Sequence, residues 1–130
     1  IYYGTEILLE GGYDPDNRRC FDWNTDNRDE GFLEMTKQLL AIRRQETVQR
    51  GEIRITSRGE LFCLSRWLGE EELLLMTNES DEALQIDMTG EILAANLLQT
   101  GEQSERCRIS GSLEKDGFVI IRGKKGGCGL

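Results

Sequence analysis

Histidine is absent from this sequence. Without an imidazole, the chain can form neither a Ser-His-Asp triad nor a Cys-His pair, and it lacks the commonest ligand of transition metals. The four cysteines are Cys20, Cys63, Cys107 and Cys128, and their spacings contain no Cys-x-x-Cys of a zinc or redox motif. We therefore expect no metal site and no cofactor. The thiols are most simply small buried or incidental side chains, and the sequence leaves a disulfide open.

Two further features are missing, a long apolar run and an excess of positive charge. No segment approaches the length of a membrane span, and no signal-like segment opens the chain. Asp and Glu number 24 against 16 Lys and Arg, a formal net charge of −8, whereas binding to a phosphate backbone requires clustered cations. We expect neither nucleic acid nor membrane as a partner, and a location in the cytoplasm, with secretion as the alternative.

The chain opens on a short apolar and aromatic run, Ile1–Gly4, without polar alternation. This pattern is typical of a parallel strand that is covered on both faces. Such a strand requires neighbours at both of its edges, and nothing in this sequence precedes it to supply one. The run therefore predicts that the chain is the tail of a larger protein, cut inside a domain. A polar, turn-rich loop follows and extends to about Gly31.

A helix is predicted after this loop. Asp29 is a suitable N-cap, because its carboxylate can accept a hydrogen bond from the first helical turn. Apolar residues then recur at helical spacing, and they are Phe32, Met35, Leu39 and Ile42. A core-facing helix explains this stripe more simply than a helix that binds a partner.

Beyond Gly51 the apolar pattern changes to that of short strands. The strand-like segments are residues 53–55, 61–67, 73–77, 84–86 and 118–121. Turn signals separate them, at Arg58-Gly59, Asn78–Asp81, Thr89-Gly90 and Asp116-Gly117. Several short strands without helices between them are typical of an antiparallel β-sandwich.

The order of strand, long loop, helix and sandwich resembles the end of an alpha-amylase family glycoside hydrolase. The opening run resembles the eighth barrel strand of that family, Gly11–Arg18 its Gly-Gly-x-Asp-Pro-x-x-Arg loop, and Leu39–Arg44 its last barrel helix. Arg50–Glu52 resembles the entry into the C-terminal domain, and Ala95–Glu102 a late turn before the closing strand. With Arg19–Trp23 after the loop, the chain is most similar to the neopullulanase, cyclomaltodextrinase and maltogenic amylase group.

The resemblance implies a fold that is α/β plus all-β. Residues 1–50 would supply the last strand, loop and helix of a catalytic (β/α)8 TIM barrel, and residues 51–130 a C-terminal antiparallel β-sandwich. It implies a retaining α-glucan hydrolase for α-1,4 bonds, with α-1,6 bonds as a second class, in maltodextrins, cyclodextrins or pullulan. The catalytic carboxylates would lie upstream, so we expect no catalytic residue here and an inactive chain. The expected partners are an α-glucan oligosaccharide, the upstream barrel, and a second copy in the parent enzyme.

A candidate substrate-binding site lies in the loop. Ligands of a (β/α)8 barrel meet the loops that follow its strands, and this loop is longer than most strand-to-helix connections. Asp14-Pro15 sets a turn, and Arg18 follows within reach of it. A carboxylate and a guanidinium so placed can accept from and donate to adjacent sugar hydroxyls. The resemblance implies that Asp14 and Arg18 bind a glucose unit, and Tyr13 can stack on a sugar ring; an ion pair that only shapes the loop is the alternative.

Two other interpretations stay open. Residues 22–26 alternate oxygen ligands as a calcium loop does, but they lack the glycine and glutamate of that motif, so a solvated loop explains them better. The chain could also be a free-standing, non-catalytic carbohydrate-binding or interaction module. Exposed aromatic residues on one face of the sandwich would favour this module, whereas Phe62, Trp67 and Phe118 stand inside apolar runs, which favours their burial.

Overall fold

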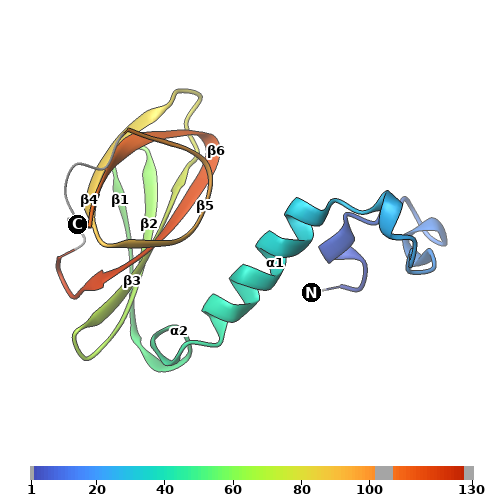
Figure 1. Cartoon of the computed structure of the whole chain (residues 1–130), viewed down its shortest axis with the longest axis horizontal. Helices are drawn as coiled ribbons and strands as arrows, with labels where there is room; N and C mark the ends of the chain where they lie inside the picture. The colour runs from blue at the N-terminus through green and yellow to red at the C-terminus, as the bar shows by residue number, and fades with distance from the viewer. Residues whose placement is uncertain (1, 102–106, 128–130) are drawn as a thin grey trace. The chain divides into compact units, whose positions relative to one another are not determined.

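The computed structural model of the chain describes residues 2–101 and 107–127 (Figure 1). The chain divides into two compact units, Ile1–Ala41 and Ile42–Leu130, which we call the loop unit and the sandwich unit. The domain boundary predicted after residue 50 lies elsewhere, at the change from helix to strand, and it stays a prediction. No helix among the described residues is long and apolar enough to cross a membrane.

Local hydrogen bonds build the loop unit. Its elements are the short 3-10 helices η1 (Thr5–Ile7), η2 (Asp16–Arg18) and η3 (Thr25–Asn27), followed by the greater part of α1 (Glu30–Arg43). Asp29 Oδ1 accepts a hydrogen bond from the backbone N–H of Phe32 at 2.8 Å, which satisfies a donor in the first turn of α1. The predicted N-cap and the predicted helix are both confirmed.

The strand predicted over Ile1–Gly4 is not formed by the residues that the structure describes, and Ile1 lies outside them. Thr5 donates from its backbone N–H and from its hydroxyl to the carbonyl of Tyr2, at 3.3 and 2.8 Å, and Gly4 adopts the left-handed conformation with φ of 83°. These contacts close a turn. A barrel strand needs hydrogen-bonding neighbours at its edges, and the described part of the loop unit contains no strand that could pair with it. The barrel portion of the predicted fold is therefore not formed in this structure.

The sandwich unit contains the short helix α2 (Glu46–Arg50) and a six-stranded antiparallel sheet. The strands are β1 (Glu52–Arg58), β2 (Leu61–Leu68), β3 (Glu71–Asn78), β4 (Leu84–Thr89), β5 (Glu91–Thr100) and β6 (Arg108–Lys124). Each of the five segments that the apolar pattern predicts as strands lies inside β1, β2, β3, β4 or β6. These five predictions are confirmed.

Strand β6 is shared by the two layers of the sandwich. Its C-terminal part, residues 118–124, pairs with β3, and its N-terminal part, residues 108–113, pairs with β4. β5 pairs with β6 along both parts, and the sheet of order β1-β2-β3-β6-β4 therefore folds over on itself (Figure 1). The antiparallel β-sandwich predicted from the sequence is confirmed.

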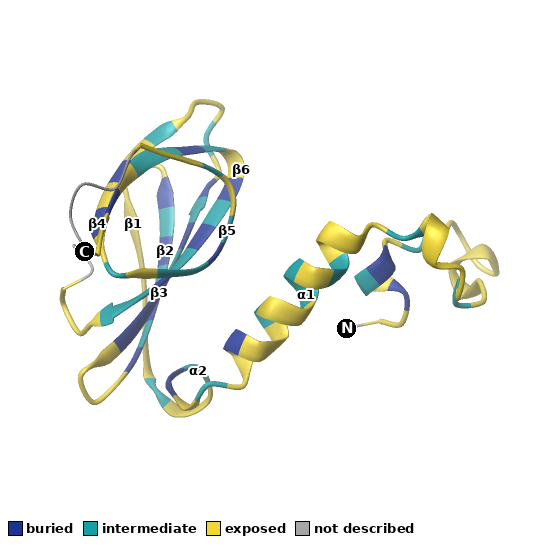
Figure 2. Cartoon of the chain, in the orientation of Figure 1, coloured by how far each residue is buried: buried dark blue, intermediate teal, exposed yellow. Residues whose placement is uncertain are grey.

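Side chains that point between the layers form the core. β2 alternates buried and part-buried residues from Leu61 to Trp67, as a strand with two different faces does. The most deeply buried side chains come from β2, β3, β4 and β6, and they include Cys63, Leu74, Met76, Met88, Ile109, Leu113, Val119 and Ile121. In Figure 2 the inner strands carry dark blue segments, whereas β1 is exposed along its whole length.

Strand β5 was not predicted, because Ala95–Glu102 resembles a turn. The structure places these residues up to position 100 in β5, and Glu102 lies outside the described residues. The register with β6 shifts within Ile92–Ala94 and again within Asn96–Leu98. The first shift is a β-bulge, one extra residue on β5, and at the second shift one residue of β5 stands against residues 114–117 of β6. These irregularities change which side chains face inward, and they interrupt the alternation by which a strand is detected in a sequence.

The turn predicted at Asp116-Gly117 is not a chain reversal. Both residues lie inside β6, where Asp116 adopts a left-handed φ of 59°. A Cβ atom on Gly117 would lie 2.8 Å from the carbonyl oxygen of Glu114, so the backbone packs closely here. These residues lie between the part of β6 that pairs with β4 and the part that pairs with β3. The turn residues mark the place where β6 passes from one layer to the other.

Candidate functional site

The three predicted binding residues lie around one turn of the loop unit. The carbonyl of Tyr13 accepts a hydrogen bond from the backbone N–H of Asp16 at 2.7 Å, and η2 follows. This turn brings Arg18 back to Asp14, with Arg18 Nη2 2.8 Å from Asp14 Oδ1. The structure therefore pairs Asp14 with Arg18, and their role in binding stays a prediction.

Both members of this ion pair are open to solvent. The side chains of Arg18 and Asp14 are 62% and 67% exposed, and Tyr13 beside them is 97% exposed. An ion pair this exposed contributes about 0–1 kcal/mol to stability, because water screens the charges and holding two long side chains costs entropy. This geometry allows the one ion pair both to shape the loop and to contact a ligand.

Arg19 organises the loop, and the sequence argument did not single it out. Its guanidinium donates from Nε and Nη2 to the two carboxylate oxygens of Asp16, each at 2.7 Å. This fork holds the pKa of Asp16 below its usual range. The Tyr3 hydroxyl donates to the backbone carbonyl of Arg19 at 2.8 Å, so the start of the chain is joined to the loop. The contact between Arg19 and Asp16 could have been predicted from the sequence, because the arginine follows the aspartate by three residues.

A hollow of about 210 Å³ opens beside this fork. Its lining combines aromatic, polar and charged side chains with backbone, from Tyr2, Tyr3, Glu10, Gly12, Asn17 and Arg19 among others. A Cβ atom on Gly12 would lie 2.8 Å from Asp16 Oδ2, so a side chain at this position would displace the fork. The hollow is a concave surface with donors and acceptors next to aromatic rings, a combination that suits a sugar ring.

The second half of the loop is held by Asp22. One carboxylate oxygen accepts from the backbone N–H of Asn24 at 2.8 Å, and the other accepts from Asn27 Nδ2 at 2.9 Å. These bonds, that from Asn27 first, hold the pKa of Asp22 below its usual range. The ring of Trp23 lies 4.6 Å from that of Phe21 and is 79% exposed. The carboxylate that the calcium interpretation would use serves the turn itself.

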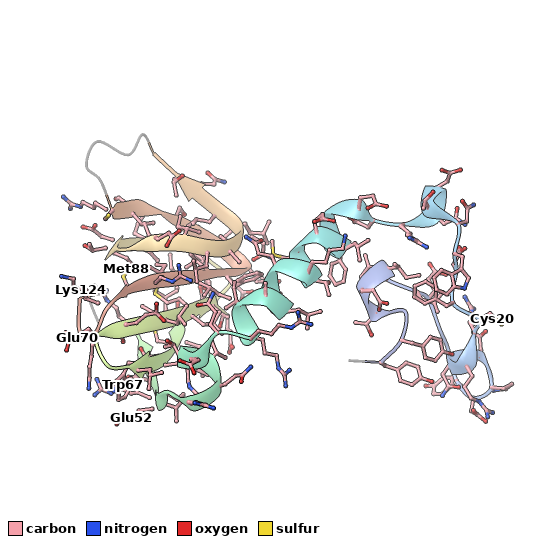
Figure 3. The ribbon with its side chains drawn as sticks, turned by 60° about the horizontal axis from the view of Figure 1, so that its bottom comes forward. Cys20, Glu52, Trp67, Glu70, Met88 and Lys124 are labelled. Atoms are coloured by element: carbon pink, nitrogen blue, oxygen red, sulfur yellow. The ribbon has the colours of Figure 1, made fainter. Side chains whose placement is uncertain are left out.

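The tryptophan of the sandwich unit, Trp67, is far less exposed than Trp23. Trp67 is 9% exposed, and two cations lie over its ring, Arg54 at 5.4 Å and Lys125 at 5.0 Å from the ring centroid. Figure 3 labels Trp67 with Glu52, Glu70 and Lys124 at one end of the sheet, and Cys20 on the loop unit. Phe62 and Phe118 are part-buried. The exposed aromatic face that would favour a free-standing sugar-binding module is therefore not found among these three residues.

Comparison with known proteins shows that the chain is similar to part of longer enzymes. No family model matches it. It is 34% identical over 130 residues to a cyclomaltodextrinase of Geobacillus thermopakistaniensis, a match that covers 92% of this chain and 22% of the relative. It is 31% identical over 93 residues to an intracellular maltogenic amylase of Bacillus subtilis, which covers 68% of this chain and 16% of the relative.

A solved structure agrees with these matches. The crystal structure of the maltogenic amylase from S. marinus superposes on the whole of this chain and on 17% of its own, with a TM-score of 0.71 and 30% identity. The fold thus defines the class: a helix followed by the C-terminal β-sandwich of alpha-amylase family enzymes. The chain belongs to the alpha-amylase family of glycoside hydrolases and matches its C-terminal part, as its motifs indicate. It spans about a fifth of the length of these relatives.

Proposed function

We propose that this chain is the C-terminal part of a retaining α-glucan hydrolase. The enzyme would hydrolyse the α-1,4 glucosidic bonds of maltodextrins, cyclodextrins or pullulan, with α-1,6 bonds as a second class. The observation that carries the proposal is the match of 92% of the chain to a cyclomaltodextrinase. The similarity to maltogenic amylases supports it in both sequence and structure.

The loop unit supplies part of the substrate site in this proposal. Asp14 accepts from one sugar hydroxyl and Arg18 donates to a neighbouring one, while Tyr13 stacks on the apolar face of a ring. The support is the 2.8 Å pairing of the two charged groups on an exposed turn, with the aromatic residue next to them. A glucose unit can exchange into this pairing, because the ion pair is held only weakly in water.

The catalytic carboxylates belong to the part of the enzyme that precedes this chain. A retaining glycosidase needs a nucleophile and an acid/base carboxylate about 5–5.5 Å apart. The resemblance assigns both to earlier barrel strands, so this chain alone has no hydrolytic activity. Residues 1–4 form the eighth barrel strand once neighbouring strands are present to accept and donate its backbone hydrogen bonds. The enzyme works in the cytoplasm, as the name of its intracellular relative suggests.

The test is the substitution Arg18→Ala in the full-length enzyme, with maltooligosaccharides as substrates. We expect kcat/KM to fall about tenfold or more, which corresponds to at least ~1.4 kcal/mol of lost binding to the transition state. Arg18→Lys keeps the charge but not the fork, and we expect an intermediate loss. Arg50→Ala is the matched control, because Arg50 is a 74% exposed arginine on α2. Equal kinetics for Arg18→Ala and the control would contradict the binding role.

A further inference from the structure

The two adjacent arginines of the loop unit hold two different carboxylates. Arg18 Nη2 lies 2.8 Å from Asp14 Oδ1, whereas Arg19 donates from Nε and Nη2 to the two carboxylate oxygens of Asp16, each at 2.7 Å. Arg19 follows η2 with an extended backbone, φ of −61° and ψ of 149°, so the chain leaves the helix at this residue. The loop therefore contains two neighbouring ion pairs, and the proposed function uses only the first.

The pair of Arg19 with Asp16 has the more restrictive geometry. A planar guanidinium that donates to both oxygens of a carboxylate fixes the orientation of the two groups as well as their distance. Arg19 also lies near a second carboxylate, with Nη1 3.8 Å from Glu10 Oε2, and its side chain is 45% exposed against 62% for Arg18. The fork lowers the pKa of Asp16 and raises the pKa of Arg19, so both groups stay charged. Arg19 is thus suited to hold the loop, and Arg18 to exchange its partner for a ligand.

The fork lies against the backbone that carries Tyr13 and Asp14. A Cβ atom on Gly12 would lie 2.8 Å from Asp16 Oδ2, so the carboxylate packs directly on the residue before Tyr13. The backbone N–H of Asp16 donates to the carbonyl of Tyr13 at 2.7 Å. Asp16 therefore contacts this segment through both its side chain and its backbone. A shift of the Asp16 carboxylate would move the segment, and the side chain of Asp14 with it.

We propose that Arg19 is a positioning residue for glucan binding: its fork with Asp16 sets the geometry of Asp14 and Arg18, and Arg19 itself contacts no sugar. This inference deepens the proposed function and rests on it. Recognition by two side chains depends on their mutual placement, and a displacement of about 1 Å can reduce a rate by up to about a hundredfold. The contacts that carry the inference all lie within residues 12–19, so the fork forms from neighbouring residues alone.

The test compares KM and kcat for maltooligosaccharides in the full-length enzyme with Arg19→Ala, with Asp16→Ala and with both changes. Each change breaks the same fork, so we expect the same several-fold rise of KM in all three variants. We expect kcat to stay nearly unchanged, because the lost interactions bind substrate and transition state alike. Arg19→Lys keeps the charge without the planar fork and should raise KM less. Lys37→Ala is the control, because it removes an exposed ion pair with Glu34 from α1 of the same unit.

Combination with Arg18→Ala separates positioning from direct binding. A positioning residue acts through Asp14 and Arg18, so Arg19→Ala should raise KM much less when residue 18 is already alanine. Full additivity of the two changes would show that Arg19 contacts the sugar itself and would overturn the inference. A raised KM for Arg19→Ala beside a normal KM for Asp16→Ala would overturn it in the same way.

The same variants distinguish a failure of this inference from a failure of the proposed function. A raised KM for Arg18→Ala together with an unchanged KM for Arg19→Ala overturns the inference alone. A fall of kcat with an unchanged KM in Arg19→Ala, matched by a smaller folded fraction in circular dichroism, assigns the fork to the fold and also overturns it. Normal kinetics for Arg18→Ala, or no maltodextrin hydrolysis by the unsubstituted enzyme, overturns the proposed function and this inference with it.

Discussion

Arg122 joins the start of the sandwich unit to its last strand. Its Nη2 atom donates to Gln45 Oε1 at 3.0 Å, and its Nη1 atom donates to Glu91 Oε2 at 3.2 Å. Its Nε atom lies 3.6 Å from Glu71 Oε2. One side chain on β6 thus contacts the residue before α2 and the first residues of β3 and β5. These partners are far apart in the sequence, so the contact exists only in the folded sandwich.

The substitution Arg122→Lys tests this contact. Lysine keeps the charge but cannot reach several acceptors with a planar fork, so the free energy of unfolding should fall by about 1 kcal/mol. Urea unfolding of the 130-residue chain, followed by tryptophan fluorescence, measures the change. Arg50→Lys serves as the control, because Arg50 pairs only with solvent-exposed Glu46 in its own helix among the contacts described. An equal, negligible effect of both changes would contradict the structural role of Arg122.

Asn78 fixes the crossing from β3 to β4. It is 1% exposed, and its Nδ2 donates to the carbonyls of Glu82 and Leu113, each at 2.8 Å. Asn78→Ala leaves these carbonyls without that donor, so we expect a loss of about 1–3 kcal/mol in unfolding free energy. Gln85→Ala, at an exposed position on β4, should change it little. Chemical denaturation compares the two. Asn78 also begins an Asn-x-Ser sequon, and its burial predicts that the folded chain is not glycosylated there.

The N-cap of α1 can be tested on its own. Asp29 Oδ1 accepts from the N–H of Phe32, so Asp29→Ala should cost about 1 kcal/mol of helix stability, and Asp29→Ser should restore most of it. Far-ultraviolet circular dichroism during thermal unfolding measures the helical signal. The order alanine, serine, aspartate in increasing stability is expected, and any other order would contradict the capping role.

The pairing of Asp87 with Arg108 predicts a pH dependence. Arg108 donates to both carboxylate oxygens of Asp87, at 3.0 and 2.7 Å, and thereby lowers the pKa of Asp87. A lowered folded-state pKa gives stability that is present above the unfolded value, about 3.9, and is lost as the pH falls through the folded pKa. The stability difference between the unchanged chain and Asp87→Asn should therefore shrink below about pH 4. A difference that stays constant from pH 7 to pH 3 would exclude this pairing as its source.

How far the sequence predicts the fold depends on how local each signal is. The helix Glu30–Arg43 was predicted correctly, because its cap and its apolar spacing lie within one segment. β2 was found because Leu61–Trp67 is a dense apolar run within one segment. β5 was not found, since its register with β6 shifts twice and its side chains do not alternate regularly between two faces. The opening run has the composition of a buried strand, but a strand forms only where another strand supplies its hydrogen bonds.

The contacts of the candidate site also differ in how far they could be predicted, according to how close their residues are in the sequence. Asp14 and Arg18 could be paired from their spacing, and the structure places them 2.8 Å apart. Arg19 and Asp16, which form the fork, are equally close in the sequence. Because Arg18 and Arg19 are adjacent, however, the sequence does not say which arginine pairs with which carboxylate. The contact of Tyr3 with the carbonyl of Arg19 spans sixteen positions and has no signal in the sequence.

The sequence by itself determined the family, the helix, five of the strands and the exposed turn with Asp14 and Arg18, because each depends on neighbouring residues. Only the tertiary structure decided that β6 bends at Asp116-Gly117 to serve both layers, and that Arg122 meets Gln45. It also decided which apolar face of the sheet is the core and which, at Ile53 and Ile55, stays exposed. These depend on residues brought together from distant positions, and alternation along a strand distinguishes two faces without saying which of them is covered.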